Sequence, residues 1–145
     1  MIALIQRVTS ASVTVEGETC GAIEAGILAL VAVQPDDTAA KAARLAERVL
    51  TYRVFPDDDK RMNKSLLDQK YALLAVPQFT LAADTKKGTR ASFMRAAPPQ
   101  LGRELFDRFV VECNQRLACV ETGRFGTHMK VMLENDGPVT FWLQV

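Results

Sequence analysis

Two short segments combine residue types that support chemistry with positions where active sites are commonly built. The first, Pro77-Gln-Phe-Thr-Leu81, follows an apolar run that predicts a buried strand, and sites in α/β folds often lie at strand ends. It offers an amide, an aromatic ring and a hydroxyl in a row. The same spacing also fits a plain strand exit with Phe79 in the core, so the residues alone leave both interpretations open.

The second segment, Asn135-Asp-Gly-Pro-Val-Thr140, lies between two predicted strands. Its Asp-Gly pair favours a tight hairpin turn, but Pro138 would then stand at the first ladder position without an N–H to donate. A longer turn centred on Gly137 and Pro138 would accommodate a cis bond, although only about 5–6% of X–Pro bonds are cis. The residues leave these two turns open.

Other chemistries find little support in the sequence. The chain has one histidine, His128, and its cysteines, Cys20, Cys113 and Cys119, do not pair at ligand spacing, so we expect no metal site. We expect a structural or surface role for His128, because a catalytic histidine needs partners that the sequence does not show. The acidic run at 57–59 is typical of a solvated turn. There is no phosphate-binding or dinucleotide fingerprint, and no cofactor is expected.

Hydrophobic periodicity predicts the elements that position these segments. Alternation and short apolar runs predict strands, at residues 1–8, 11–15, 20–24, 27–33, 54–55, 71–76, 128–134 and 139–145. Helical spacing predicts one amphipathic helix over 37–52, starting at Pro35-Asp36-Asp37. A second helix begins at Pro98 and Pro99 and carries its apolar face to Leu117. The stretch between, 82–98, lacks periodicity and is expected to be a basic loop.

This order of elements predicts an α/β fold in which a mixed sheet has two main helices packed on one side. The segment from 27–33 through the first helix to 71–76 has the form of a right-handed crossover. We expect residues 1–145 to form a single domain, as the length of 145 residues suggests.

Composition excludes several classes of protein. Hydrophobic residues make up 48% and charged residues 24%, which excludes disordered, collagen-like and disulfide-scaffold chains. The net charge of +1 predicts no nucleic-acid partner overall, although a local basic patch can exist in a neutral chain. No apolar stretch is long enough to span a membrane. The odd number of cysteines favours reduced thiols and a cytoplasmic location.

Over its whole length the chain resembles the bacterial D-aminoacyl-tRNA deacylases. The match includes both ends of the chain and several separated motifs, which makes it more specific than a single fingerprint. The matching segments are Met1-Ile-Ala-Leu-Ile-Gln-Arg-Val8, Ala11-Ser-Val-Thr-Val15, Gln78-Phe-Thr-Leu-Ala-Ala-Asp84, Ser92-Phe93, Thr122-Gly-Arg-Phe-Gly126 and residues 129–145 with Asn-Asp-Gly-Pro-Val-Thr-Phe-Trp-Leu.

The resemblance implies a barrel-like fold and an activity. Members of the family hydrolyse the ester that joins a D-amino acid to the 3′-terminal adenosine of tRNA, and they also remove glycine mischarged on tRNA(Ala). It implies a cytoplasmic homodimer that acts on aminoacyl-tRNA, with active sites at the subunit interface, no metal, no cofactor and no membrane association.

The resemblance also assigns roles to residues. Gln78, Phe79 and Thr80 lie at the reacting end, where backbone N–H groups hold the carbonyl oxygen, and the favoured mechanism has the 2′-OH of the terminal ribose orient or activate the water. The alternative is Thr80 as a nucleophile, which would need an adjacent base that the sequence does not show. Gly137 and Pro138 form a cis pair that enters the partner subunit's pocket and rejects L-amino acids. Two further residues, Met129 and Arg7, belong to the substrate-binding set. Independently of the resemblance, the positive charge of the basic loop makes Lys86, Lys87, Arg90 and Arg95 candidates for contacts with RNA phosphates. The residues leave a solvated loop without that role equally open.

One position departs from the pattern. The family usually has serine before Gln-Phe-Thr-Leu, where this chain has Pro77, so a serine hydroxyl has no role here. A related deacylase branch, which acts on small L-amino acids mischarged to tRNA, has proline at that position. That branch and a non-catalytic RNA- or ligand-binding module of the same fold are the alternative functions.

Overall fold

The computed structural model describes all residues from 1 to 145. Its sheet is built around β1 (Ile2–Val15), a single long strand where the sequence predicted two. β1 pairs antiparallel with β2 (Glu18–Ile23) through a tight turn and with β3 (Gly26–Ala32) along its first half. The segments 1–8 and 11–15 are continuous because both halves of β1 also pair with β8 (Lys130–Gln144).

The sheet is mixed, as predicted. β6 (Ala72–Pro77) lies parallel to β3, and β7 (Val120–Thr122) lies parallel to β6. The strand order is β2-β1-β3-β6-β7 with β8 on β1, which makes a six-stranded sheet that is nearly closed and barrel-like. The three-residue strand β7 was not predicted, because its short sequence carries no periodic signal.

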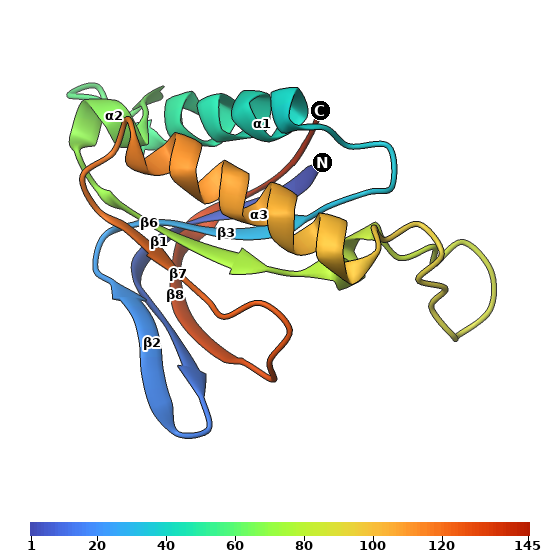
Figure 1. Ribbon diagram of the computed structural model, residues 1–145. Helices are drawn as coiled ribbons and strands as arrows, with labels where there is room; N and C mark the ends of the chain where they lie inside the picture. The colour runs from blue at the N-terminus through green and yellow to red at the C-terminus, as the bar shows by residue number, and fades with distance from the viewer.

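Two helices, α1 (Ala39–Thr51) and α3 (Pro99–Asn114), lie on the same face of the sheet, as Figure 1 shows. Their apolar sides and the facing strand residues form the largest core cluster, which includes Leu45, Val49, Phe109 and Leu143. A second, smaller cluster fills the space between the β1–β2 hairpin and β6. None of the helices has the length and apolar character needed to cross a bilayer.

Short elements complete the chain between the main ones. A small hairpin of β4 (Phe55–Pro56) and β5 (Met62–Lys64) is followed by α2 (Leu66–Gln69) and leads into β6. The 3₁₀ helix η1 (Phe79–Ala82) follows β6 directly. After η1, the predicted basic loop extends away from the body of the molecule (Figure 1), interrupted only by a bridge between Asp84 and Ser92.

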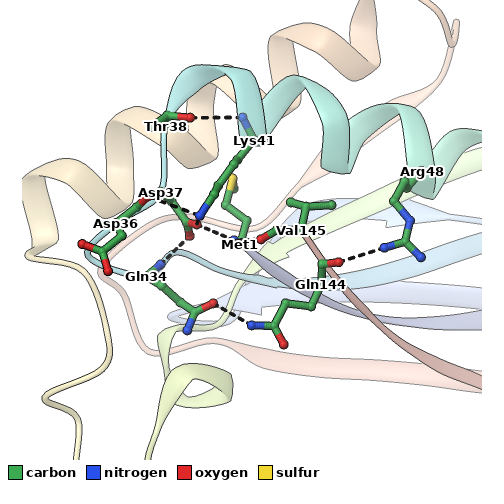
Figure 2. A network of polar contacts seen from close by, with 9 residues as sticks. All are labelled: Met1, Gln34, Asp36, Asp37, Thr38, Lys41, Arg48, Gln144 and Val145. Carbon is green, nitrogen blue, oxygen red and sulfur yellow. Dashed lines mark hydrogen bonds and ion pairs between the residues drawn. The ribbon is translucent and has the colours of Figure 1, made fainter.

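The first helix begins later than predicted. Its N-cap is Thr38, whose hydroxyl accepts a hydrogen bond from the N–H of Lys41. Asp37 is instead buried and accepts hydrogen bonds from the N–H of Gln34 and from the ammonium group of Met1, as Figure 2 shows. Burial lowers the pKa of that ammonium group, and the hydrogen bond from it to Asp37 opposes the shift. The carboxylate therefore ties the first strand to the start of α1.

The C-terminal part of the chain also differs from the prediction. Residues 128–134 and 139–145 are not two strands joined by a turn, because β8 continues through both. Its pairing with β1 jumps from Asn135–Val8 to Thr140–Gln6, which leaves residues 136–139 as a bulge opposite Arg7. Residues 136–138 of this bulge are exposed, whereas Val139 is buried in the core. The peptide bond between Gly137 and Pro138 in this bulge is cis, as the resemblance implied.

Candidate active site

A cavity of about 500 Å³ lies where β3 and β6 end. Val31 and Val33 form one wall, and the exit of β6 forms another with Pro77, Gln78 and Phe79. The start of α3 and the segment 125–131 close the remaining sides, and more than half of the lining residues are hydrophobic. The strand-end segment singled out in the sequence therefore does border a pocket.

Gln78 and Thr80 are held by local hydrogen bonds at the edge of this pocket. The N–H of Gln78 donates to the carbonyl of Val31 at 2.8 Å, which extends the β3–β6 pairing by one step. The side-chain amide of Gln78 donates to the Thr80 hydroxyl at 2.5 Å. An amide is not a base, so the structure places no general base on the Thr80 hydroxyl.

The chain turns into η1 immediately after Gln78, and this turn exposes backbone donors. The first N–H groups of a helix have no acceptor within it, and the side chain of Gln78 does not cap η1. The uncapped groups belong to Phe79 and Thr80, both of which are exposed. Phe79 packs against Phe93 from the basic loop, with ring centroids 5.2 Å apart.

Met129 is positioned by a glycine, Gly123, that follows β7 directly at the edge of the pocket. The N–H of Gly123 donates to the carbonyl of Ala75 at 2.8 Å, which places the end of β7 beside β6. A β-carbon on Gly123 would lie 2.8 Å from the Met129 sulfur and 3.3 Å from a methyl group of Val76. The absence of a side chain at Gly123 therefore makes the space in which the thioether of Met129 lies.

The opposite wall of the pocket was not predicted from the residues. Phe125 lies against Gly102 of α3, where a β-carbon would approach its ring to 3.2 Å, and the guanidinium of Arg103 lies 5.1 Å from the ring centroid. His128, for which we expected a structural or surface role, is exposed but lines the pocket next to Met129. The only signal for this wall was the matching segment from Thr122 to Gly126.

Gly137 and Pro138 do not border the pocket of their own chain. They are exposed on the bulge of β8, where Arg7 holds the neighbouring backbone. The Arg7 Nε donates to the Asp136 carbonyl at 3.0 Å and lies 2.9 Å from the Asp136 carboxylate, while Nη1 donates to the Val54 carbonyl at 2.6 Å. The predicted site residues thus form two separate groups within one chain.

The basic loop forms a third, separate group. Lys86, Lys87 and Arg90 are exposed and make no ion pair, and Arg95 lies 3.7 Å from the carboxylate of Asp84. Nowhere do three His, Cys, Asp or Glu side chains gather as metal ligands. Burial raises the pKa of the Cys113 thiol to about 12, so this cysteine carries no thiolate nucleophile at neutral pH.

Together, the mixed α/β fold and the apolar pocket at its strand ends define an enzyme-like architecture, and comparisons with known proteins identify the family. The family model described as D-Tyr-tRNA(Tyr) deacylase matches residues 4–144. The D-aminoacyl-tRNA deacylase of Thioalkalivibrio sulfidiphilus (strain HL-EbGR7) is 62% identical over 150 residues, covering 100% of this chain and 97% of the relative. That of Escherichia coli O81 (strain ED1a) is 56% identical, with both chains fully covered.

A solved structure, that of a c-Myc DNA unwinding element binding protein, has the same fold with a TM-score of 0.95. It is 37% identical and covers 100% of this chain and 99% of its own. The family match over nearly the whole sequence shows that the chain belongs to the D-Tyr-tRNA(Tyr) deacylase family. The protein is thus an enzyme of the hydrolase class.

Proposed function

We propose that the protein hydrolyses the ester bond of D-aminoacyl-tRNA, releasing a free D-amino acid and tRNA, and that it removes glycine from tRNA(Ala) in the same way. The observation that carries this proposal is the apolar pocket bordered by Gln78 and Phe79 beside uncapped backbone N–H groups. Family membership and relatives named for this activity support it. The proposal includes a cytoplasmic location, where aminoacyl-tRNA is used.

The chemistry rests on backbone groups and on the substrate itself. The N–H groups of Phe79 and Thr80 would bind the ester carbonyl oxygen and stabilise the oxyanion that forms when water attacks. The 2′-OH of the terminal ribose would orient or activate that water. Thr80 is not the nucleophile in this mechanism, because its hydroxyl faces the neutral amide of Gln78 rather than a base.

Selection against L-amino acids is assigned to Gly137 and Pro138 of a second copy of the chain. Both residues are exposed on the β8 bulge and lie outside their own pocket, which supports a role in the pocket of another subunit. A backbone wall next to the substrate Cα leaves room for hydrogen or a D side chain and excludes an L side chain. The lack of a side chain at Gly137 permits the close approach.

The face of the sheet opposite the helices supports a homodimer. Leu4 pairs with Leu30 on one side and with Trp142 on the other, and residues directly opposite each other in a sheet share a face. The two leucines are only half-buried and Trp142 is 50% exposed. An exposed apolar row of this kind favours contact with a partner surface. In a two-fold dimer, the bulge of each subunit would enter the pocket of the other.

The remaining predicted residues take supporting roles in this proposal. Arg7 fixes the backbone beside Gly137 through its contacts with Asp136, and Met129 lines the pocket that receives the amino acid. Lys86, Lys87, Arg90 and Arg95 would contact phosphates of the tRNA from the exposed loop. This loop starts directly after η1, and its Phe93 packs against Phe79 at the edge of the pocket, which supports such a role.

The deciding experiment compares release of amino acid from D-tyrosyl-tRNA, L-tyrosyl-tRNA and glycyl-tRNA(Ala) by the full chain. We expect hydrolysis of the first and third and no hydrolysis of the second. Hydrolysis of small L-aminoacyl esters alone would assign the protein to the related branch, and tRNA binding without hydrolysis would make it a binding module.

The variant Gly137→Ala tests the wall directly. Its methyl group would displace the exposed side-chain amide of Asn135 and lie 3.2 Å from the backbone nitrogen of Val139. We expect the cost to the fold to be small, because the Asn135 side chain is free to move at the surface of the bulge. We expect cleavage of D-tyrosyl-tRNA to fall while the melting temperature stays unchanged. A variant with full activity would contradict the assignment of Gly137 to the substrate contact.

A further inference from the structure

A second cleft, of about 510 Å³, lies on the α1 side of the molecule and shares no lining residue with the first pocket. Three arginines line it, Arg44 and Arg48 from α1 and Arg53 just after this helix. Tyr52 and Phe141 form an aromatic pair in the same cleft, with ring centroids 5.4 Å apart. The mechanism proposed above uses none of these residues.

The charges of this arginine cleft are largely free to bind a ligand. Its lining contains no acidic residue. Arg44 contacts the carboxylate of Glu47 on the helix surface, and Arg48 donates only to the neutral carbonyl of Gln144. Arg53 makes no ion pair within 4 Å, although, after local hydrogen bonds, its charge contributes to the lowered pKa of the exposed Asp68 carboxyl. Guanidinium groups suit phosphate oxygens in particular, because their donors form a planar fork. The cleft therefore has the chemistry to hold a polyanion.

The aromatic pair narrows the class of ligand. Nucleic-acid strands bind where basic groups follow the backbone and aromatic rings receive bases or ribose rings. Tyr52 and Phe141 place such rings among the three arginines. An isolated phosphate would use the arginines alone, whereas an RNA strand uses both features of the cleft.

The position of the cleft connects it to the proposed site. Phe141 lies on the same strand as Gly137 and Pro138, just past the bulge. Arg7 joins the two regions, since it donates to the Asp136 carbonyl on one side and to the Val54 carbonyl, next to Arg53, on the other. The cleft thus flanks the bulge and not the pocket of its own chain.

We propose that the arginine cleft of each subunit binds backbone phosphates near the 3′ end of the tRNA whose terminal adenosine occupies the other subunit's pocket. This inference rests on the proposed function, in which the bulge of one subunit enters the pocket of the other. The strand that leaves that pocket then passes the flanks of the bulge, where the arginine cleft lies. Each tRNA is consequently held by both subunits.

The first experiment measures kcat/KM of the full-length variant Arg44→Gln/Arg53→Gln on two substrates, D-tyrosyl-tRNA and the D-tyrosyl ester of adenosine. Only the first carries the phosphates, so we expect a loss of about tenfold on tRNA and no change on the adenosine ester. The slope of log kcat/KM against log salt should become shallower by about 1.4, since each single-strand phosphate contact contributes about 0.7. Thermal melts verify that the variant is folded.

Arg116→Gln is a matched control for Arg53→Gln, because each variant removes one positive charge. Arg116, 42% exposed at the end of α3, makes only a 3.9 Å contact with Glu112 and does not line the cleft. Arg116→Gln should keep the wild-type rate and salt slope, while Arg53→Gln alone lowers both. Equal behaviour of the two single variants would overturn the inference, whereas failure of the wild type to cleave either substrate would overturn the proposed function.

Mixed dimers test which subunit the cleft serves. In the first dimer, one subunit carries Met129→Trp, which fills its pocket, and the other carries Arg44→Gln/Arg53→Gln. The open pocket of the second subunit is then served by the intact cleft of the first, so we expect the wild-type rate per open pocket. In the second dimer, a wild-type subunit is combined with a subunit that carries all three changes. The open pocket of the wild-type subunit is then served by an altered cleft, so we expect the reduced rate of the Arg44→Gln/Arg53→Gln variant. The reverse pattern, or a monomer in solution, would refute binding across the subunits.

Discussion

The contact between Gly123 and Met129 allows a test of how tightly the pocket is shaped. In Gly123→Ala the new methyl carbon would lie 2.8 Å from the Met129 sulfur, whereas non-bonded atoms of this size prefer about 3.5–4.0 Å. Val76 and Pro77 stand at 3.3 and 3.4 Å on the other sides and belong to a paired strand, so they yield little. The sulfur must therefore move by about 1 Å, and the open direction is into the pocket.

The expected result is a loss of activity without a comparable loss of stability. A misplacement of about 1 Å in a substrate-positioning group can lower the rate by about 10²-fold, so kcat/KM on D-tyrosyl-tRNA should fall between about 10- and 100-fold. Overpacking in this half-buried region should cost less than about 2 kcal/mol of unfolding free energy, which urea titration measures.

A double-mutant cycle identifies the cause. In the Met129→Ala background no sulfur is left to be displaced, so adding Gly123→Ala should change kcat/KM by less than about threefold, because the two effects act through one contact. Equal losses from Gly123→Ala in both backgrounds would show that the displacement of Met129 is not the reason, and the reasoning about the pocket would be wrong.

Three further predictions follow from the site and the core. Thr80→Ala should retain deacylation within about tenfold, or about 1.4 kcal/mol of barrier; a loss of about 10⁴-fold would identify Thr80 as the nucleophile. Incubation with EDTA should leave the rate unchanged, because no cluster of metal-ligating side chains exists; inactivation that zinc or magnesium reverses would contradict this. Asp37→Asn should lower the unfolding free energy by about 3–5 kcal/mol, since it leaves the buried Met1 ammonium without a counter-charge; calorimetry would show this, and an unchanged melting temperature would refute it.

Much of the fold was predictable because its main elements carry strong periodic patterns. The apolar run that became β3 and the amphipathic patterns of α1 and α3 each bury one continuous surface, and such surfaces are visible in the sequence. The predicted start of α1 was wrong, because Asp37 is of a type that often caps helices. Its carboxylate is used instead by the Met1 ammonium and Gln34, a long-range contact that local spacing does not reveal.

The candidate site was predictable only in part, for a related reason. Gln78 and Phe79 were found because they follow a buried strand, but the opposite wall of the pocket comes from α3 and from the segment after β7. Phe125 and His128 belong to a stretch without periodicity, and only the packing of β7 against β6 brings it to the pocket. The sequence predicts residues at strand ends better than the loops that face them across a cavity.

The bulge of β8 explains the proline that did not fit an ordinary turn. Pro138 cannot donate to a ladder, and a bulge is a place in a sheet where no donation is required. Pairing with β1 resumes on both sides, at Asn135–Val8 and Thr140–Gln6, so the exposed residues are anchored at both ends by strand pairing rather than carried on a free hairpin tip. An element that must hold backbone atoms against a substrate needs rigid support of this kind. If Gly137 and Pro138 select the substrate as proposed, the geometry of β8 therefore favours a fixed surface over a mobile lid.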